Sequence, residues 1–114
     1  MIVKSITFFD RAAAKPIPAD GGNTSPLLTN PNNGIALQLQ VDGSNINIQI
    51  ECRIQNDESQ EWHTVGAISL LDYRIFETIT KKGEYQISMD GIGYCRVIDK
   101  GSGADLAVYG NLTA

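Results

Sequence analysis

Residues 35–54 read IALQLQVDGSNINIQIECRI, and this stretch decides the fold that the sequence predicts. Apolar and polar residues alternate over 35–42 and again over 46–54, with a turn-forming Asp42-Gly43-Ser44-Asn45 segment between the two runs. Because side chains on a strand point alternately to opposite faces, each run predicts a strand with one buried face. The Asp-Gly step suits a tight turn, so we expect a strand pair whose apolar face packs on a second sheet.

The rest of the chain also alternates between short strand patterns and turn signals. About eight strands with no long amphipathic helix are typical of an antiparallel β-sandwich, and eight strands in two sheets favour a jelly-roll-like one. At 114 residues the chain is expected to be a single all-β domain, residues 1–114. Besides the two runs above, strands are expected at 2–9, 62–68, 73–80, 85–89, 94–99 and 104–112.

Residues 10–34 interrupt this pattern. The segment 10–15 is expected to form a single helical turn that Pro16 ends, and the remainder is rich in proline, glycine and asparagine. So long a loop is uncommon inside a compact domain, and we therefore expect an irregular loop or arm. Its small apolar anchor, Pro26-Leu27-Leu28, is expected to dock either on the chain's own core or on a neighbouring subunit.

Charge and hydropathy argue against several classes of partner. The net charge of −4 and the isoelectric point near 4.7 argue against binding to nucleic acid. No apolar run approaches the roughly 20 residues that cross a bilayer, so no membrane insertion is expected. The N-terminus is a poor signal peptide, because Lys4 interrupts it and Asp10-Arg11 ends it early. We therefore expect synthesis in a cytoplasm without export by the general route.

Cys52 and Cys95 each fall on the apolar face of an expected strand, so they could lie near each other in the core. The pattern leaves open whether they form a disulfide, but without an export signal two buried reduced thiols are favoured. Two cysteines and one histidine do not build a structural zinc site. No metal or other cofactor is expected.

No group of residues in the sequence points to catalysis. His63, the one histidine, is expected to face solvent at the start of a short strand, and no nucleophile is paired with it. Asp57, Glu58 and Glu61 are the densest carboxylate cluster, but a polar loop does not hold two carboxylates at the separation that a glycosidase needs. The Gly-x-Gly pairs at 91–93 and 101–103 do not open a helix, so turns are expected. We therefore expect no enzymatic activity.

The aromatic residues suggest one candidate ligand platform. Tyr94 and Tyr109 are expected on neighbouring strands with their side chains outward, Arg96 lies beside them, and Trp62 is a further candidate. Exposed rings on one sheet face are typical of sandwiches that stack on sugars. The other interpretation, which the pattern favours, is that these rings pack in the core or at a subunit interface.

The order of motifs over residues 35–112 resembles that of small β-sandwich proteins from tailed-phage virions, of the head-decoration, head-fibre and tail-associated types. Shared features are a tryptophan-bearing strand, a Gly-x-Tyr entry into a strand, and a Gly followed by an Arg-Val pair. The segments that carry the resemblance are 45–53, 61–65, 79–87, 89–97, 101–103 and 106–110. The resemblance implies a non-enzymatic virion protein that binds other virion proteins, and it transfers no catalytic residue.

Such a protein is expected to self-assemble, with a trimer favoured. Obligate interfaces are rich in apolar and aromatic groups. The interface candidates are Phe8, Phe9, Leu27, Leu28 and Phe76. The alternative function is a carbohydrate-binding module, for which Trp62, Tyr94, Arg96 and Tyr109 would form the platform.

Overall fold

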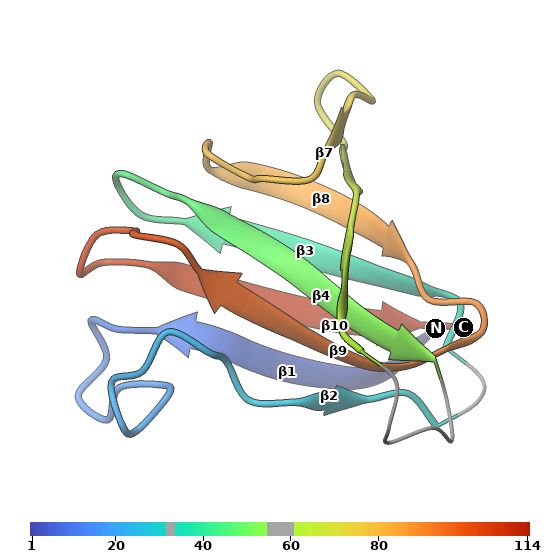
Figure 1. The fold of residues 1–114 in the computed structure, drawn as a ribbon, viewed down its shortest axis with the longest axis horizontal. Coiled ribbons are helices and arrows are strands. Elements are labelled where there is room, and N and C mark those ends of the chain that lie inside the picture. Colours follow the sequence, from blue (N-terminus) through green and yellow to red (C-terminus); the bar gives the residue numbers. More distant parts are fainter. Residues whose placement is uncertain (32–33, 55–60) are drawn as a thin grey trace.

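Two antiparallel sheets packed face to face form the molecule (Figure 1). The computed structural model describes residues 1–31, 34–54 and 61–114, and these residues form ten strands. The strands are β1 (Ile2–Asp10), β2 (Leu28–Thr29), β3 (Ala36–Asp42), β4 (Ile48–Ile54), β5 (His63–Val65), β6 (Ala67–Ser69), β7 (Ile75–Phe76), β8 (Gly83–Ser88), β9 (Ile92–Asp99) and β10 (Ala107–Thr113). No helix that could span a membrane is found in this described part of the chain.

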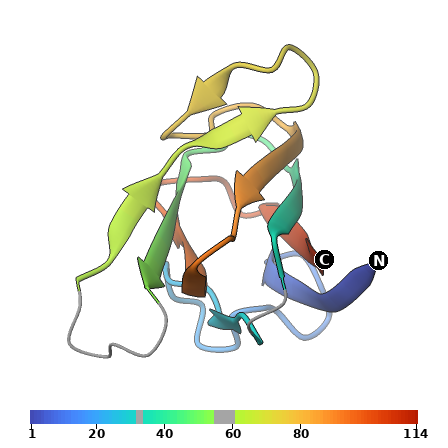
Figure 2. The same cartoon turned by 90° about the vertical axis from the view of Figure 1, so that its right-hand side faces the viewer.

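The strand order confirms the predicted all-β sandwich. One sheet has six strands in the order β1-β10-β3-β8-β6-β7, and the other has four in the order β2-β9-β4-β5. The expected strand at 62–68 is divided into β5 and β6, which lie in different sheets and are joined at Gly66 (Figure 2). A Cβ on Gly66 would lie 2.5 Å from Cγ2 of Ile75, so a larger residue there would displace this side chain of β7.

The predicted pairing of residues 35–42 with 46–54 is wrong. β3 lies in the six-stranded sheet between β10 and β8, whereas β4 lies in the four-stranded sheet between β9 and β5. The turn at Asp42-Gly43-Ser44-Asn45 carries the chain from one sheet to the other. Gly43 has a φ of 126°, and its Cα approaches the backbone of Asp105 so closely that a Cβ would lie 3.0 Å from the carbonyl oxygen. The apolar faces of β3 and β4 therefore oppose each other across the core.

The same crossing between sheets occurs at two later turns. The turn at 90–91 joins β8 in the large sheet to β9 in the small one, and residues 100–106 return the chain to β10 in the large sheet. Buried apolar side chains from both sheets meet between the layers in one core. Its largest fully buried members are Phe8, Phe9, Leu28, Leu37, Leu39, Ile48, Ile50, Ile79, Ile87, Met89, Leu106 and Leu112.

Two of the interface candidates, Phe8 and Phe9, are wrong because both are core residues with 0% exposure. Adjacent residues of a regular strand cannot both point inward. Here the pairing of β1 with β10 shifts between Thr7 and Phe9, and this β-bulge turns both rings into the core. The alternation of the sequence gave no sign of the irregularity.

The arm after β1 packs on the chain's own sandwich. β2 pairs with the edge of β9, which places Leu28 opposite Cys95 with 0% exposure. Leu28 is therefore also wrong as an interface residue, and the anchor docks on its own core. The expected helical turn at 10–15 is instead a non-helical turn and bend. Residues 32–33 of the arm and Asp57 and Glu58 of the carboxylate cluster lie outside the described residues.

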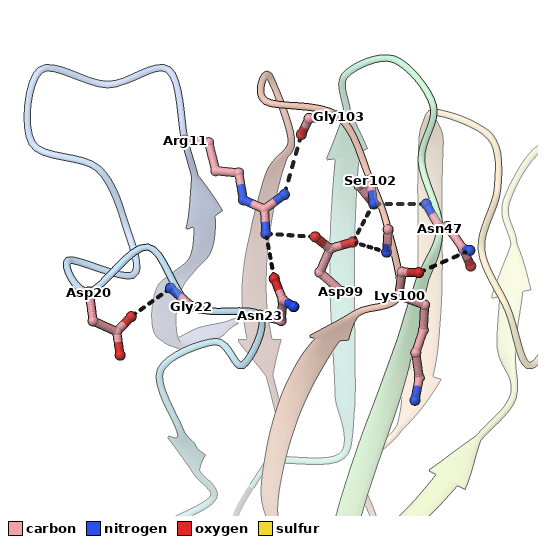
Figure 3. A network of polar contacts seen from close by, with 10 residues as sticks. Arg11, Asp20, Gly22, Asn23, Asn47, Asp99, Lys100, Ser102 and Gly103 are labelled. Carbon is pink, nitrogen blue, oxygen red and sulfur yellow. Dashed lines mark hydrogen bonds and ion pairs between the residues drawn. The ribbon is translucent and has the colours of Figure 1, made fainter.

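Two polar groups hold the arm in place. The buried Asn30 amide donates to the carbonyls of Gly34, Met89 and Ile92 at 2.9–3.2 Å, and its oxygen accepts from the Gly34 N–H. Arg11 forms an ion pair with the nearly buried Asp99 at 2.6 Å (Figure 3). Burial acts to raise the pKa of Asp99, but hydrogen bonds from Ser102, Gly101 and Arg11 outweigh it and lower the pKa.

Candidate interaction surfaces

The β6–β7 hairpin, residues 67–76, carries several of the large apolar side chains that are exposed among the described residues. It projects from the end of the six-stranded sheet, where β7 is the outermost strand (Figure 1). Leu71, Tyr73 and Ile75 are 91%, 76% and 70% exposed. Ile68 and Phe76, which lie on the paired strands of the hairpin, are also exposed. Large apolar side chains gathered on one projection are typical of an interaction site.

Local hydrogen bonds hold the hairpin tip in one shape. The Tyr73 N–H donates to the Ser69 carbonyl, and the Ser69 N–H donates to the Arg74 carbonyl, both at 2.8 Å. The Asp72 carboxylate accepts from the Arg74 N–H at 3.1 Å. Tyr73 has a φ of 59°, a conformation that costs a bulky side chain free energy. The turn therefore presents Leu71 and Tyr73 outward while its backbone is bonded within the hairpin.

A pocket of about 230 Å³ lies beside the hairpin. Its apolar part comes from Leu71, Phe76 and Tyr85, and basic and acidic residues also line it. The hydroxyl of Tyr85 donates to the Lys81 carbonyl at 2.6 Å. Burial, and secondly the negative charge of Asp72, raise the pKa of Tyr85. The other lining residues are Ser69, Asp72, Arg74, Thr80, Lys81, Lys82, Gly83 and Glu84.

The second candidate surface is a cluster of aromatic and arginine side chains outside the four-stranded sheet. The Arg53 guanidinium lies 4.6 Å from the ring centroid of Trp62 and 4.8 Å from that of Tyr94. The Arg96 guanidinium lies 4.0 Å from the Trp62 centroid. Arg96 also pairs with Glu51, its register partner on β4, through Nε and Nη2 at 2.9 Å each.

This cluster brings together three of the four predicted platform residues and leaves out the fourth. Tyr109 lies on β10 in the other sheet, so the expectation that Tyr94 and Tyr109 occupy neighbouring strands is wrong. The hydroxyl of Tyr109 donates to the Asp10 carboxylate at 3.0 Å, and this hydrogen bond is the main cause that raises the pKa of Tyr109. Sugar stacking needs accessible ring faces, and here guanidinium groups already approach the rings of Trp62 and Tyr94.

The hairpin and Arg53 are the features that sequence reasoning missed. Of the predicted interface residues, only Leu27 and Phe76 are exposed, and Phe76 alone belongs to the hairpin. The available signal was the composition of residues 69–73, where a turn carries Leu70, Leu71 and Tyr73 in place of the usual small polar residues. Arg53 could have been found from its place on the outward face of β4, two residues after Glu51.

The fold and these surfaces define the chain as a two-sheet antiparallel β-sandwich with a projecting apolar hairpin. No protein-family model matches the sequence, and no curated protein matches it significantly. A solved structure with this fold is that of the SPBc2 prophage-derived protein YomS, which superposes with a TM-score of 0.74. The two chains are 14% identical, and the match covers 97% of this chain and 94% of YomS. At this identity the likeness establishes a shared fold.

Proposed function

We propose that this chain is a non-enzymatic phage structural protein that self-assembles and binds other virion proteins. It would serve as a capsid-decoration, head-fibre or tail component and would reside in the virion. The observation that carries the proposal is the exposed apolar β6–β7 hairpin, with Leu71, Tyr73 and Ile75 held outward by its own turn. The fold shared with a prophage-derived protein supports the phage assignment.

Association would remove these side chains from water, and each 100 Å² of apolar surface buried contributes roughly 2.5 kcal/mol. A stable interface needs about 800 Å² from each partner, so the hairpin would act together with the pocket beside it. The projection of one copy could enter the pocket of a neighbouring copy, and contacts of this kind close into a ring when the rotation between copies allows it. We favour a trimer, because threefold and sixfold symmetry suit virions.

Light scattering during size-exclusion chromatography tests this proposal. The wild-type protein is expected to have a mass in solution greater than the 12.4 kDa of one chain, and three times that mass for the favoured trimer. The double variant Leu71→Asp/Ile75→Asp is expected to elute as a monomer, since charges in an apolar contact are desolvated without partners. The matched control is Ile35→Asp, an exposed isoleucine outside the hairpin, which is expected to leave the oligomer intact. A monomeric wild-type protein, or an oligomer that survives the hairpin variant, would contradict the proposal.

Carbohydrate binding, for example to a host receptor, is the alternative function. The observation that favours it is the grouping of Trp62, Tyr94 and Arg96 on one sheet face. In this alternative the arginine side chains would shift to open the rings. A glycan array gives the measurement: a signal that Trp62→Ala removes and Tyr109→Ala leaves unchanged would support binding at this cluster. Absence of signal at high protein concentration would remove the alternative.

A further inference from the structure

Cys52 and Cys95 face each other inside the core. They are register partners on the antiparallel strands β4 and β9, and both thiols are free. Their side chains are buried on the inward face of the four-stranded sheet. Neither cysteine takes part in the hairpin or in the aromatic and arginine cluster.

The backbone hydrogen bonds show which kind of antiparallel pair the two cysteines form. Ile48 exchanges both of its backbone hydrogen bonds with Ile79, at 2.9 and 3.1 Å, on the side of β4 that faces away from β9. Backbone groups alternate along a strand, so those of Cys52, four residues later, also point away from β9. On β9, the carbonyls of Gly93 and Val97 accept hydrogen bonds from backbone N–H groups of the arm. The backbone groups of Cys95, midway between these two residues, therefore also point toward the arm and away from β4.

Cys52 and Cys95 therefore form a non-hydrogen-bonded pair with respect to the β4–β9 ladder. Directly opposed residues at such positions have Cα atoms about 4.5 Å apart, the closest side-chain approach in an antiparallel sheet. Disulfides span Cα separations of roughly 4.4–6.8 Å, so a bond can form here without separating the strands. The neighbouring Cys52 thiol is the main cause that raises the pKa of Cys95, with burial second, in agreement with this closeness.

We propose that Cys52 and Cys95 are a modification site, at which a low-molecular-weight disulfide such as oxidised glutathione converts the two thiols into an intrachain cross-strand disulfide. The first cysteine thiolate attacks one sulfur of the small disulfide and releases one small thiol. The second thiolate attacks the resulting mixed disulfide, forms the Sγ–Sγ bond and releases the other small thiol. The protein gives up two protons and two electrons, and the small disulfide is reduced to two thiols.

Burial sets the conditions under which the bond forms. Both thiols are shielded in the native sandwich, and the thiolate that exchange requires is scarce where the pKa is raised. The reaction therefore needs local opening of the small sheet or takes place during folding. β2, which covers the β9 side of the pair, is only two residues long, so the outer edge of the small sheet is the short path by which an oxidant would reach Cys95.

Refolding followed by mass spectrometry tests the proposal. The full chain is unfolded in guanidinium, refolded with excess oxidised glutathione, and treated with iodoacetamide after renewed unfolding. The expected product is a monomeric polypeptide that has lost both thiol hydrogens, carries no glutathione and takes up no alkyl group. Cys52→Ala is the control and is expected to retain one thiol or one glutathione. Two alkyl groups or two glutathiones per wild-type chain would overturn the proposal, as would disulfide-linked dimers.

Thermal unfolding provides a second readout that does not depend on any variant. A bond between residues 52 and 95 closes a long loop and restricts the unfolded chain, so the oxidised protein is expected to melt roughly 10 °C or more above the reduced protein. Addition of dithiothreitol is expected to return the midpoint to that of the reduced form. An oxidised sample that melts at or below the reduced one would show that the bond distorts the sandwich, and the site as described would be wrong.

Discussion

The arm at residues 11–31 and the β6–β7 hairpin contrast in a way that their compositions do not suggest. The arm is rich in proline, glycine and polar residues, yet it is bound to the sandwich by a buried leucine, a buried asparagine and an ion pair. The hairpin contains leucine, tyrosine, isoleucine and phenylalanine, yet these side chains face solvent. The composition of a segment does not decide whether it is buried. Burial depends on whether the rest of the fold offers the segment a surface and hydrogen-bonding partners.

The largest expected effect comes from breaking the ion pair of the arm. Asp99→Ala leaves the half-buried Arg11 guanidinium and the N–H groups of Gly101 and Ser102 without their acceptor. We expect the free energy of unfolding to fall by about 3–5 kcal/mol, the range for removing one partner of a buried pair. Urea denaturation measures this loss. Asp90→Ala, at an exposed aspartate, is the control, and an equal loss in both variants would show that the ion pair is not the cause.

A smaller loss is expected from removal of the buried amide of the arm. Asn30→Ala takes away the donor of three backbone carbonyls and the acceptor of the Gly34 N–H. Buried polar groups left without partners cost about 1–3 kcal/mol, so the midpoint of urea denaturation is expected to fall accordingly. Asn111→Ala, which removes a surface hydrogen bond from Ser5, is expected to change stability much less.

Acid is expected to weaken the attachment of the arm. The pKa of Asp99 is lower in the folded protein than the value of about 3.9 in an unfolded chain. Its ionised form therefore stabilises the fold at pH values above the unfolded pKa, and this contribution is lost as the pH falls through the folded pKa. Stability measured between neutral pH and pH 2 is expected to decrease over the acidic part of that range. The decrease should be shallower in Asp99→Asn, and an unchanged pH profile in that variant would refute the assignment.

The smallest effect on stability is expected at the hairpin. Leu71→Ser changes a side chain that is almost fully exposed, so the free energy of unfolding of the dissociated protein should stay within about 0.5 kcal/mol of wild type. If the hairpin forms the subunit contact, the same variant should weaken association, and analytical ultracentrifugation over a range of concentrations measures this. A large loss of monomer stability would mean that Leu71 packs within its own chain, and the contrast with the arm would fail.

The alternation of residues 35–42 and 46–54 was enough to predict which side chains face the core, except at its two ends, where Ile35 and Ile54 are exposed. Leu37, Leu39, Ile48, Ile50 and Cys52 are all buried, as the pattern indicates. The partners of these strands could not be predicted, because the turn at 42–45 was interpreted as a hairpin and instead joins two sheets. The bulge that buries both Phe8 and Phe9 was equally unpredictable, since it arises from the pairing with β10.

For the candidate sites, the sequence identified individual residues better than their groupings. Trp62, Tyr94 and Arg96 do lie together, but Tyr109 belongs to the opposite sheet, and Arg53 was not included. Phe76 was named as an interface residue without Leu71 and Ile75, which are more exposed than it is. The place of Tyr109 depends on strand order, which local patterns do not contain, whereas the hairpin is a local grouping whose composition was the available signal.

By itself, the sequence determined that this protein is an all-β sandwich and which face of most strands is buried. This follows because side chains alternate along a strand and the apolar ones must leave water. Only the tertiary structure decided which strands are neighbours, that the arm binds its own chain, and that Cys52 faces Cys95. Strands pair through backbone N–H and C=O groups that are the same in every residue. An alternating pattern therefore specifies a face of the strand and leaves its partner to the packing of the whole chain.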